Sequence, residues 1–414
     1  MKAVVIGGGI IGLCSAWYLL QDGWEVTVLD KGDLSNNCSY GNMGMIVPSH
    51  FVPLAAPGMV QQGIRWMFNS RSPFYVKPRL SRELFSWGWQ FMKSATAAKV
   101  EQAAAPLRDI NLLSRHLYEQ LATTPGFNFG MEQKGIIMYY KTAAVRDEEA
   151  HLAEKAVKMG LDAAVLDKAA LQQLEPAVQL NVLGGVHYRC DAHLYPNGLM
   201  QQLLRALQER GVKITGGQQV EKIISSNGKV KAVITAAGSH TADLFVVAAG
   251  SWSAAIARMA GINIPLQPGK GYSVTLNQPA VSLQVPAILC EARVALTPMR
   301  GKLRFGGTME IAPANNTVNM KRVEGIVQSI GQYFENLNIT MPDKNEVWHG
   351  FRPCTPDGLP FIGYAKGTDN LLLAGGHAMM GLSLGPATGK LIAELAGHQA
   401  PSVGISHFSP GRFN

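Results

Sequence analysis

The chain has 414 residues, of which 47% are hydrophobic and 16% charged, a composition that excludes disordered and fibrous proteins. Its net charge of +8 is spread along the chain without a Lys/Arg cluster that also holds aromatic residues, so we expect no nucleic-acid partner. The five cysteines form no CxxC pair, and no apolar run reaches the ~18 residues that span a bilayer. We therefore predict no metal site and a cytoplasmic protein.

The first thirty residues are typical of a strand, a glycine-rich turn, a helix and a second strand. AVVIG (3–7) is an apolar, β-branched run that leads into GGGIIG (7–12), which fits GxGxxG. The following helix can end at Gly23, and EVTVL (25–29) predicts a strand that ends at Asp30. This order argues against a cleaved signal peptide, which the apolar start also resembles.

Each position of the motif has a physical reason. Gly7 permits a tight turn, Gly9 lets a pyrophosphate approach the backbone, and Gly12 lets the helix pack closely on the strand. The helix N-terminus offers free N–H groups to the phosphates, and Asp30 can accept hydrogen bonds from a ribose. The motif predicts dinucleotide binding but leaves NAD and FAD open.

The next segments are less regular. Residues 31–50 are small and polar, as in a loop that runs close to a ligand. Residues 51–100 combine helix-like pieces with Trp66, Trp87 and Trp89 among basic residues. This combination fits either core packing with solvated side chains or contact with a membrane interface.

The rest of the chain alternates strands and helices. We predict a strand at 134–141, a helix at 197–210 that ends at Gly211, and then short strands with a hairpin turn at Asn227-Gly228. Further predicted features are a turn after the strand in VVAAGSW (246–252), strands over 261–344, a strand at 371–374 and a C-terminal helix. GFRPCTPDGLPFIG (350–363) holds three prolines and predicts an irregular, rigid loop that begins beside Arg352.

These features predict an α/β protein: a Rossmann-like domain into which a strand-rich second domain is inserted twice. We assign 1–50, 195–260 and 345–414 to the nucleotide-binding domain, and 51–194 and 261–344 to the substrate-binding domain.

Several motifs occur in an order that resembles a known superfamily. They are VVIGGGIIGLCSAWYL, VTVLDK, SYGNMG, VVAAGSW, GFRPCTPDGLPFIG and GGHAMMGLSLGPATG. Together they resemble the FAD-dependent D-amino-acid oxidase and dehydrogenase superfamily, which includes glycine and sarcosine oxidases. AAPGMVQQGIRWMF and SPFYVKPRL look most like bacterial D-amino-acid dehydrogenases. Within these, HAMMGLSLGPATG resembles the D-proline and D-hydroxyproline dehydrogenases more than the D-alanine enzymes.

The resemblance implies FAD as the cofactor of a two-domain α/β fold, a Rossmann-like FAD-binding domain with an inserted α+β substrate domain that carries a large mixed sheet. The residues that it implies for binding FAD are Gly7, Gly9, Ile11, Gly12, Asp30, Lys31, Ser39, Asn42, Gly44, Val220, Ala249, Gly250, Trp252, Gly376, His377, Gly381, Leu382 and Ser383. Sarcosine oxidases tether the flavin through a cysteine at the position that Gly350 occupies here, so we predict noncovalent FAD.

The resemblance also implies the reaction, a hydride transfer from the Cα of a D-amino acid to flavin N5. Arg352 is the candidate anchor of the substrate carboxylate, against a purely structural role. Tyr272 is a candidate for the same carboxylate or for packing, and His377 for a flavin contact. D-proline and cis-4-hydroxy-D-proline are candidate substrates.

We expect the electrons to pass to a quinone or another carrier, with peripheral contact at the inner membrane if the acceptor is a quinone. The alternatives are an oxygen-using oxidase of the glycine or sarcosine type and a noncatalytic dinucleotide-binding module.

Overall fold

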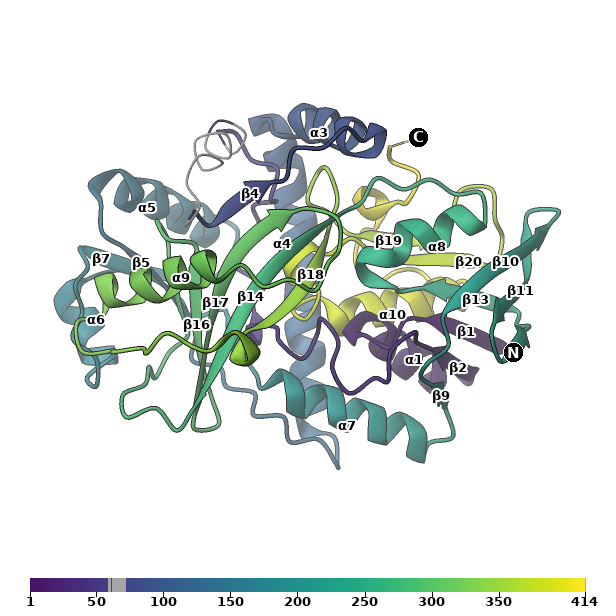
Figure 1. The fold of residues 1–414 in the computed structure, drawn as a ribbon, viewed down its shortest axis with the longest axis horizontal. Coiled ribbons are helices and arrows are strands. Elements are labelled where there is room, and N and C mark those ends of the chain that lie inside the picture. Colours follow the sequence, from purple (N-terminus) through teal and green to yellow (C-terminus); the bar gives the residue numbers. More distant parts are fainter. Residues whose placement is uncertain (59–60, 62–71, 414) are drawn as a thin grey trace.

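The computed structural model describes residues 1–58, 61 and 72–413 and contains two large sheets side by side (Figure 1). The first is a six-stranded sheet of order β19-β20-β13-β1-β2-β9, in which β19 alone is antiparallel to its neighbour. Its strands are β1 (Lys2–Ile6), β2 (Glu25–Leu29), β9 (Lys213–Thr215), β13 (Leu244–Val247), β19 (Phe361–Tyr364) and β20 (Leu371–Gly375). The start, middle and end of the chain thus contribute to one sheet, as the sequence predicts for a Rossmann-like fold.

Both faces of this sheet are covered. Ala3 and Val5 of β1 face one apolar core, and Val4 and Ile6 face another. The helices of the first core are α1 (Ile10–Gln21), α4 (Ala97–Thr123), α7 (Pro196–Glu209) and α10 (Gly385–Ala396). The second core is closed by α8 (Ser253–Met259) and by the small sheet of β10 (Val220–Ser226), β11 (Lys229–Thr235) and β12 (Gly238–His240). Strand β1 is parallel to its neighbours and buried on both faces, which explains why its residues 3–6 are all apolar.

The second large sheet has nine strands in the described residues. Eight follow the order β18-β14-β17-β16-β15-β5-β7-β6, and β4 pairs with β17. The bounds are β4 (Phe74–Val76), β5 (Ile136–Tyr140), β6 (Ala163–Asp167), β7 (Gly184–Tyr188), β14 (Gln267–Asn277), β15 (Ala287–Leu289), β16 (Val294–Met299), β17 (Lys302–Ile311) and β18 (Trp348–Cys354). The helices α3 (Arg82–Ser94), α5 (Ala143–Lys158), α6 (Lys168–Leu174) and α9 (Met320–Tyr333) belong to this half of the molecule (Figure 1).

Short elements complete the chain. The strands β3 (Met45–Ile46) and β8 (Ala192–His193) pair with each other. The 3₁₀ helices are η1 (Gly250–Trp252), η2 (Lys344–Glu346), η3 (Ala378–Met380) and η4 (Ser406–Phe408). The predicted hairpin at Asn227-Gly228 is confirmed, because both residues have positive φ between β10 and β11.

The domain boundaries stay a prediction, and two elements depart from a simple division. Helix α4 lies in the segment assigned to the substrate-binding domain, yet it packs against α10 in the core of the nucleotide-binding sheet. Strand β18 lies in a segment assigned to the nucleotide-binding domain, yet it pairs with β14 in the larger sheet.

The prediction that 350–363 is irregular throughout is wrong for its first residues. Residues 350–354 continue the edge strand β18, where Pro353 lies opposite Pro268 of β14. A proline fits there because one side of an edge strand has no ladder partner for its missing N–H group. Only the part that follows, up to β19, is irregular.

No helix in the described part of the chain is long and apolar enough to cross a membrane. Trp66 and most of the predicted Trp-rich motif around it lie outside the described residues.

Candidate active site

A cavity of about 1830 Å³ lies where loops of the six-stranded sheet meet β14, β17 and β18 of the larger sheet. It brings together most of the residues predicted from the sequence. The predicted residues that line it are Gly7, Gly9, Ile11, Asp30, Lys31, Ser39, Asn42, Val220, Ala249, Gly250, Trp252, Tyr272, Arg352, His377, Gly381, Leu382 and Ser383.

Gly12, Gly44 and Gly376 lie behind the cavity wall instead. A methyl group on Gly12 would overlap the carbonyl oxygen of Gly7, so this glycine allows α1 to approach β1. Gly44 and Gly376 both have a φ of +75°, a conformation that other residues rarely adopt. Their contribution to the site is the shape of the loops.

The glycine turn forms one end of the cavity. Gly7 has a φ of +115° and packs against the backbone of Ala248. Gly9, by contrast, borders the cavity with its backbone. A Cβ atom added to Gly9 would meet the Ser39 Oγ at 3.6 Å and no nearer atom. Helix α1 has no side-chain cap at Gly9 and no acidic residue in its first turn. Apart from the N–H of Ile10, which donates to Ser39, the N–H groups of its first turn and its positive end therefore suit a phosphate.

Asp30 and Ser39 fasten the loop after β2 to this turn. The Asp30 carboxylate accepts hydrogen bonds from the backbone N–H groups of Gly8 at 2.6 Å and Gly32 at 2.7 Å. The Ser39 hydroxyl accepts one from the N–H of Ile10 at 3.0 Å. Asp30 thus positions the loop, and its contact with a ribose stays a prediction.

Arg304 is a residue of the site that sequence reasoning missed. This buried arginine of β17 donates to the carbonyl oxygens of Tyr40 at 2.7 Å and Asn42 at 2.6 Å, and to the Thr275 hydroxyl at 2.9 Å. Arg304 holds the loop that contains Tyr40 and Asn42 against the larger sheet. Burial lowers the pKa of Arg304 to about 10. The sequence around it, KLRFGG, is an ordinary strand and gives no signal of this role.

Lys31 and Trp252 close another part of the cavity. The Lys31 Nζ lies 3.2 Å from the centre of the Trp252 ring, a cation–π contact. Trp252 in turn meets Phe351 of β18 edge to face. The pair joins the nucleotide-binding loops to the strand that carries Arg352.

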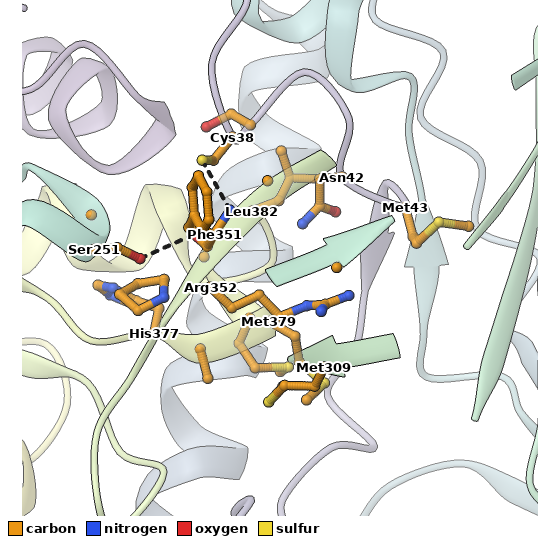
Figure 2. Close-up of a pocket in the computed structure, with 18 of the residues that line it drawn as sticks. Cys38, Asn42, Met43, Ser251, Met309, Phe351, Arg352, His377, Met379 and Leu382 are labelled. Carbon is orange, nitrogen blue, oxygen red and sulfur yellow. Dashed lines mark hydrogen bonds between the residues drawn. The ribbon is translucent and has the colours of Figure 1, made fainter. Parts of the chain in front are cut away.

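Arg352 extends into the cavity between Asn42 and Met379 (Figure 2). Its guanidinium donates to the carbonyl oxygen of Thr308 and lies directly against Gly271 of β14. In the described residues no carboxylate forms an ion pair with it, and burial lowers its pKa from that of a free arginine. An arginine still keeps its charge under these conditions, so the cavity holds an uncompensated cation.

The wall near this cation is apolar. Leu54 and Phe74 pack with Met309 in one cluster, and Met379 lies beside Met309 in Figure 2. All four line the cavity. A ligand held by Arg352 would therefore place its other atoms among carbon and thioether groups.

Tyr272 does not face Arg352. In the pairing of β14 with β18, Arg352 lies opposite Gly269 whereas Tyr272 lies opposite His349, so the two side chains leave opposite faces of the sheet. The Tyr272 hydroxyl accepts a hydrogen bond from the N–H of Asn319 at 3.2 Å, and burial raises its pKa. Its contact with a substrate carboxylate stays a prediction without geometric support.

His377 is buried beside the C-terminal glycine-rich loop. Its Nε2 shares a hydrogen bond of 2.9 Å with the Thr388 hydroxyl, and burial lowers its pKa to about 3. The ring is therefore neutral at ordinary pH, which favours a positioning role over proton transfer.

Helix α4 holds the same loop from the other side. The Tyr118 hydroxyl donates to the carbonyl oxygen of Leu382 at 2.7 Å. The Ser114 hydroxyl donates to the carbonyl oxygen of Ser383, whose own hydroxyl donates to Asn111 at 2.9 Å. Three polar residues of one buried helix face thus fix the loop that lines the cavity.

Comparison with known proteins assigns this arrangement to a family. The family model described as "DAO: FAD dependent oxidoreductase" matches residues 2–395. The chain belongs to this family. It is an enzyme, and FAD is its cofactor.

Similar proteins include two named D-amino acid dehydrogenase. That of Vibrio vulnificus (strain YJ016) is 31% identical over 405 residues, 95% of each chain. That of Allorhizobium ampelinum is 29% identical over 423 residues, all of both chains. Among solved structures, glycine oxidase from Geobacillus kaustophilus has a TM-score of 0.79 at 22% identity and 99% coverage of both chains. L-proline dehydrogenase from P. horikoshii has a TM-score of 0.76 at 20% identity, with 100% of this chain and 97% of the other covered. These structures share the fold.

The cavity fits the cofactor of this family. Its length runs from the free N-terminus of α1, past Ser39 and Asn42, to the His377 loop. When bound, FAD supplies the two-electron acceptor for oxidation of a substrate. The chain's own residues line the rest of the cavity around it.

The contact between Gly271 and Arg352 gives a first prediction. In Gly271→Ala the new methyl group would overlap the guanidinium, which must move. We expect kcat/KM to fall roughly tenfold or more, chiefly through KM, while the free energy of unfolding changes by ~1–3 kcal/mol. Gly331→Ala in α9 is the control, because no atom lies within 4 Å of its new methyl group. An unchanged KM in the folded Gly271→Ala protein would contradict the assignment.

The burial of His377 gives a pH prediction. Its pKa is about 3 in the folded protein, against about 6.5 when unfolded, so folding loses stability as pH falls below that unfolded value. Denaturant titrations at about pH 7 and pH 5 measure the effect. Between these pH values the free energy of unfolding of His377→Gln should fall by ~2 kcal/mol less than that of the wild type. The pH–rate profiles of the two proteins should have the same inflections. An inflection between about pH 6 and pH 7 that disappears in His377→Gln would instead assign the histidine to proton transfer.

Proposed function

We propose that the protein is a FAD-dependent D-amino-acid dehydrogenase. The observation that carries this proposal is Arg352, a half-buried cation without an acid partner in the described residues, at an apolar part of the cofactor cavity. Relatives that are 29% and 31% identical over essentially the whole chain bear the name D-amino acid dehydrogenase.

Arg352 would bind the carboxylate of the amino acid. Its planar guanidinium can donate two parallel hydrogen bonds, and one of its nitrogens is already held by Thr308. The hydrogen bond to the carbonyl oxygen of Thr308 fixes the orientation of the guanidinium. The carboxylate would then be anchored while Cα lies in the apolar region, where the neutral amine that oxidation requires is favoured over the ammonium.

A D-proline or cis-4-hydroxy-D-proline substrate fits the same wall. Leu54, Phe74, Met309 and Met379 present apolar and thioether groups but no side-chain charge near the cation. A compact pyrrolidine ring would pack among them without leaving a buried charge unpaired. Oxidation of such a ring would yield a cyclic imine, whereas a primary amino acid would yield an imino acid that hydrolyses in water.

We propose noncovalent FAD. The Trp348 ring lies directly on Gly350, the position where sarcosine oxidases carry the tethering cysteine, and leaves no room for a side chain there. Cys354, four residues later, is fully buried against Met309, and burial raises its pKa to about 12. A thiol in that state is a poor nucleophile.

For the electrons we propose a quinone or another carrier as the acceptor, with the protein in the cytoplasm and in peripheral contact with the inner membrane. This proposal follows the names of the relatives, which are dehydrogenases and not oxidases.

The test of the function is anaerobic reduction of the bound flavin by a panel of D- and L-amino acids, followed by reoxidation with oxygen or with a quinone analogue. We expect rapid loss of the flavin absorbance with D-amino acids, largest for cyclic ones, and faster reoxidation by the quinone analogue. Reduction by L-amino acids alone would refute the proposal. Rapid reoxidation by oxygen would point to an oxidase.

The role of Arg352 is tested by Arg352→Ala. Loss of one partner of a buried ion pair costs ~3–5 kcal/mol, so kcat/KM should fall ~100-fold or more. Arg352→Lys keeps the positive charge but cannot donate two parallel hydrogen bonds. Its kcat/KM should lie between those of the wild type and Arg352→Ala. Arg189→Ala removes an exposed arginine that pairs with Asp162 and serves as the control. Unchanged kinetics in a folded, FAD-loaded Arg352→Ala protein would reduce this arginine to a structural residue.

A further inference from the structure

Helix α3 and the residue before its cap present large apolar side chains to solvent. Leu80 is 98% exposed, Phe85 66%, Trp89 57% and Met92 50%. Phe85, Trp89 and Met92 follow the four- and three-residue spacing of one helix face. Single exposed apolar residues are ordinary on a protein surface, but a contiguous group on one element indicates an interaction site.

The opposite face of α3 packs against the rest of the protein. Trp87 is buried and donates from its Nε1 to the carbonyl oxygen of Cys354 at 2.9 Å, and it stacks on Phe91 at a ring distance of 5.2 Å. Leu84 and Phe91 pack in the same cluster as Met309. The core therefore does not need the outer side chains, and the helix stays in place without them.

The charge around the exposed face is strongly biased. Residues 77–99 contain five basic residues and a single acidic one, Glu83. Glu83 pairs with Arg258 of α8 at 2.7 Å. Lys77, Arg82 and Lys93 are exposed, and the Lys93 Nζ lies 5.0 Å from the centre of the Trp89 ring.

We infer that this surface, the α3 face of Leu80, Phe85, Trp89 and Met92 with Lys77, Arg82 and Lys93, docks on an anionic lipid bilayer. Aromatic and long apolar side chains with basic neighbours suit the headgroup boundary, and the 13 residues of α3 can lie in its plane. A second copy of the chain fits less well, because two α3 faces would bring their basic residues together. In Figure 1 α3 lies on the outside of the molecule, as docking requires.

This docking surface gives the proposed peripheral membrane contact a defined location on the protein. Docking there would place a lipid-soluble electron carrier near the active site. The inner side of α3 touches Cys354 and Met309, which belong to the strands around Arg352. The helix would then separate the bilayer from the cavity by its own thickness, about 10 Å. The inference rests on the proposed function only for this carrier, since binding to lipid needs no turnover.

The test is flotation of the FAD-loaded full chain with vesicles. We expect binding to vesicles of phosphatidylglycerol and phosphatidylcholine, little binding to phosphatidylcholine alone, and a decrease as salt rises from about 50 mM to about 500 mM. The double variant Phe85→Ser/Trp89→Ser should lower the partition coefficient at least tenfold. Lys77→Gln/Arg82→Gln/Lys93→Gln should lower it on anionic vesicles and abolish the salt dependence.

Leu183→Ser and Val157→Ser remove similarly exposed apolar residues elsewhere and should bind as the wild type does. Flavin content and the rate of flavin reduction by a D-amino acid in solution should be unchanged in all variants. Equal binding by wild type and Phe85→Ser/Trp89→Ser would overturn the inference. So would sedimentation of the wild type as a dimer that Trp89→Ser dissociates, because a second copy would then occupy the face. Neither result would affect the proposed reaction, which the solution assay measures.

Discussion

The site depends on a half-buried cation that the protein itself does not neutralise. Arg352 lies against Gly271 and donates to the carbonyl oxygen of Thr308, and the described residues supply it with no carboxylate partner. A guanidinium keeps its charge when buried, so the cavity retains an electrostatic preference for an anion. The strand that carries it is fixed on both sides, by pairing with β14 and by the bonds of Phe351 to Cys38 and Ser251. The cation is therefore held at a constant position relative to the nucleotide-binding loops.

The same loops are irregular, and polar side chains of regular elements hold them. Arg304 of β17 binds the carbonyl oxygens of Tyr40 and Asn42, while Ser114 and Tyr118 of α4 bind those of the C-terminal loop. A loop without its own hydrogen-bond ladder needs such partners for its buried backbone groups. The consequence is a preorganised cavity, in which little freedom remains to be lost when the cofactor and the substrate bind.

The sequence predicted the parts of this structure that depend on local rules. The turn at 7–12, the strand 25–29 and the hairpin at Asn227-Gly228 follow from glycine conformations and apolar periodicity within a few residues. It did not predict that 350–354 form an edge strand or that Arg304 is buried, because both depend on partners far away in the chain. Proline content argues against a strand only where both edges are paired, and no local pattern tells which strand lies at an edge.

Helix α3 shows the limit of local patterns most directly. Trp87 and Trp89 lie two residues apart in the same basic, aromatic segment, for which the sequence alone leaves core packing and membrane contact open. The structure divides them, since Trp87 is 6% exposed and bonded to Cys354 whereas Trp89 is 57% exposed. Both interpretations of the segment are therefore compatible with one helix, whose inner face packs on Cys354 and in the cluster of Met309 and whose outer face is surface. An element with two apolar faces is costly to leave in water. The exposed face of α3 therefore suits a partner, and the packing of its inner face on Cys354 and Met309 would place that partner near the strands around Arg352.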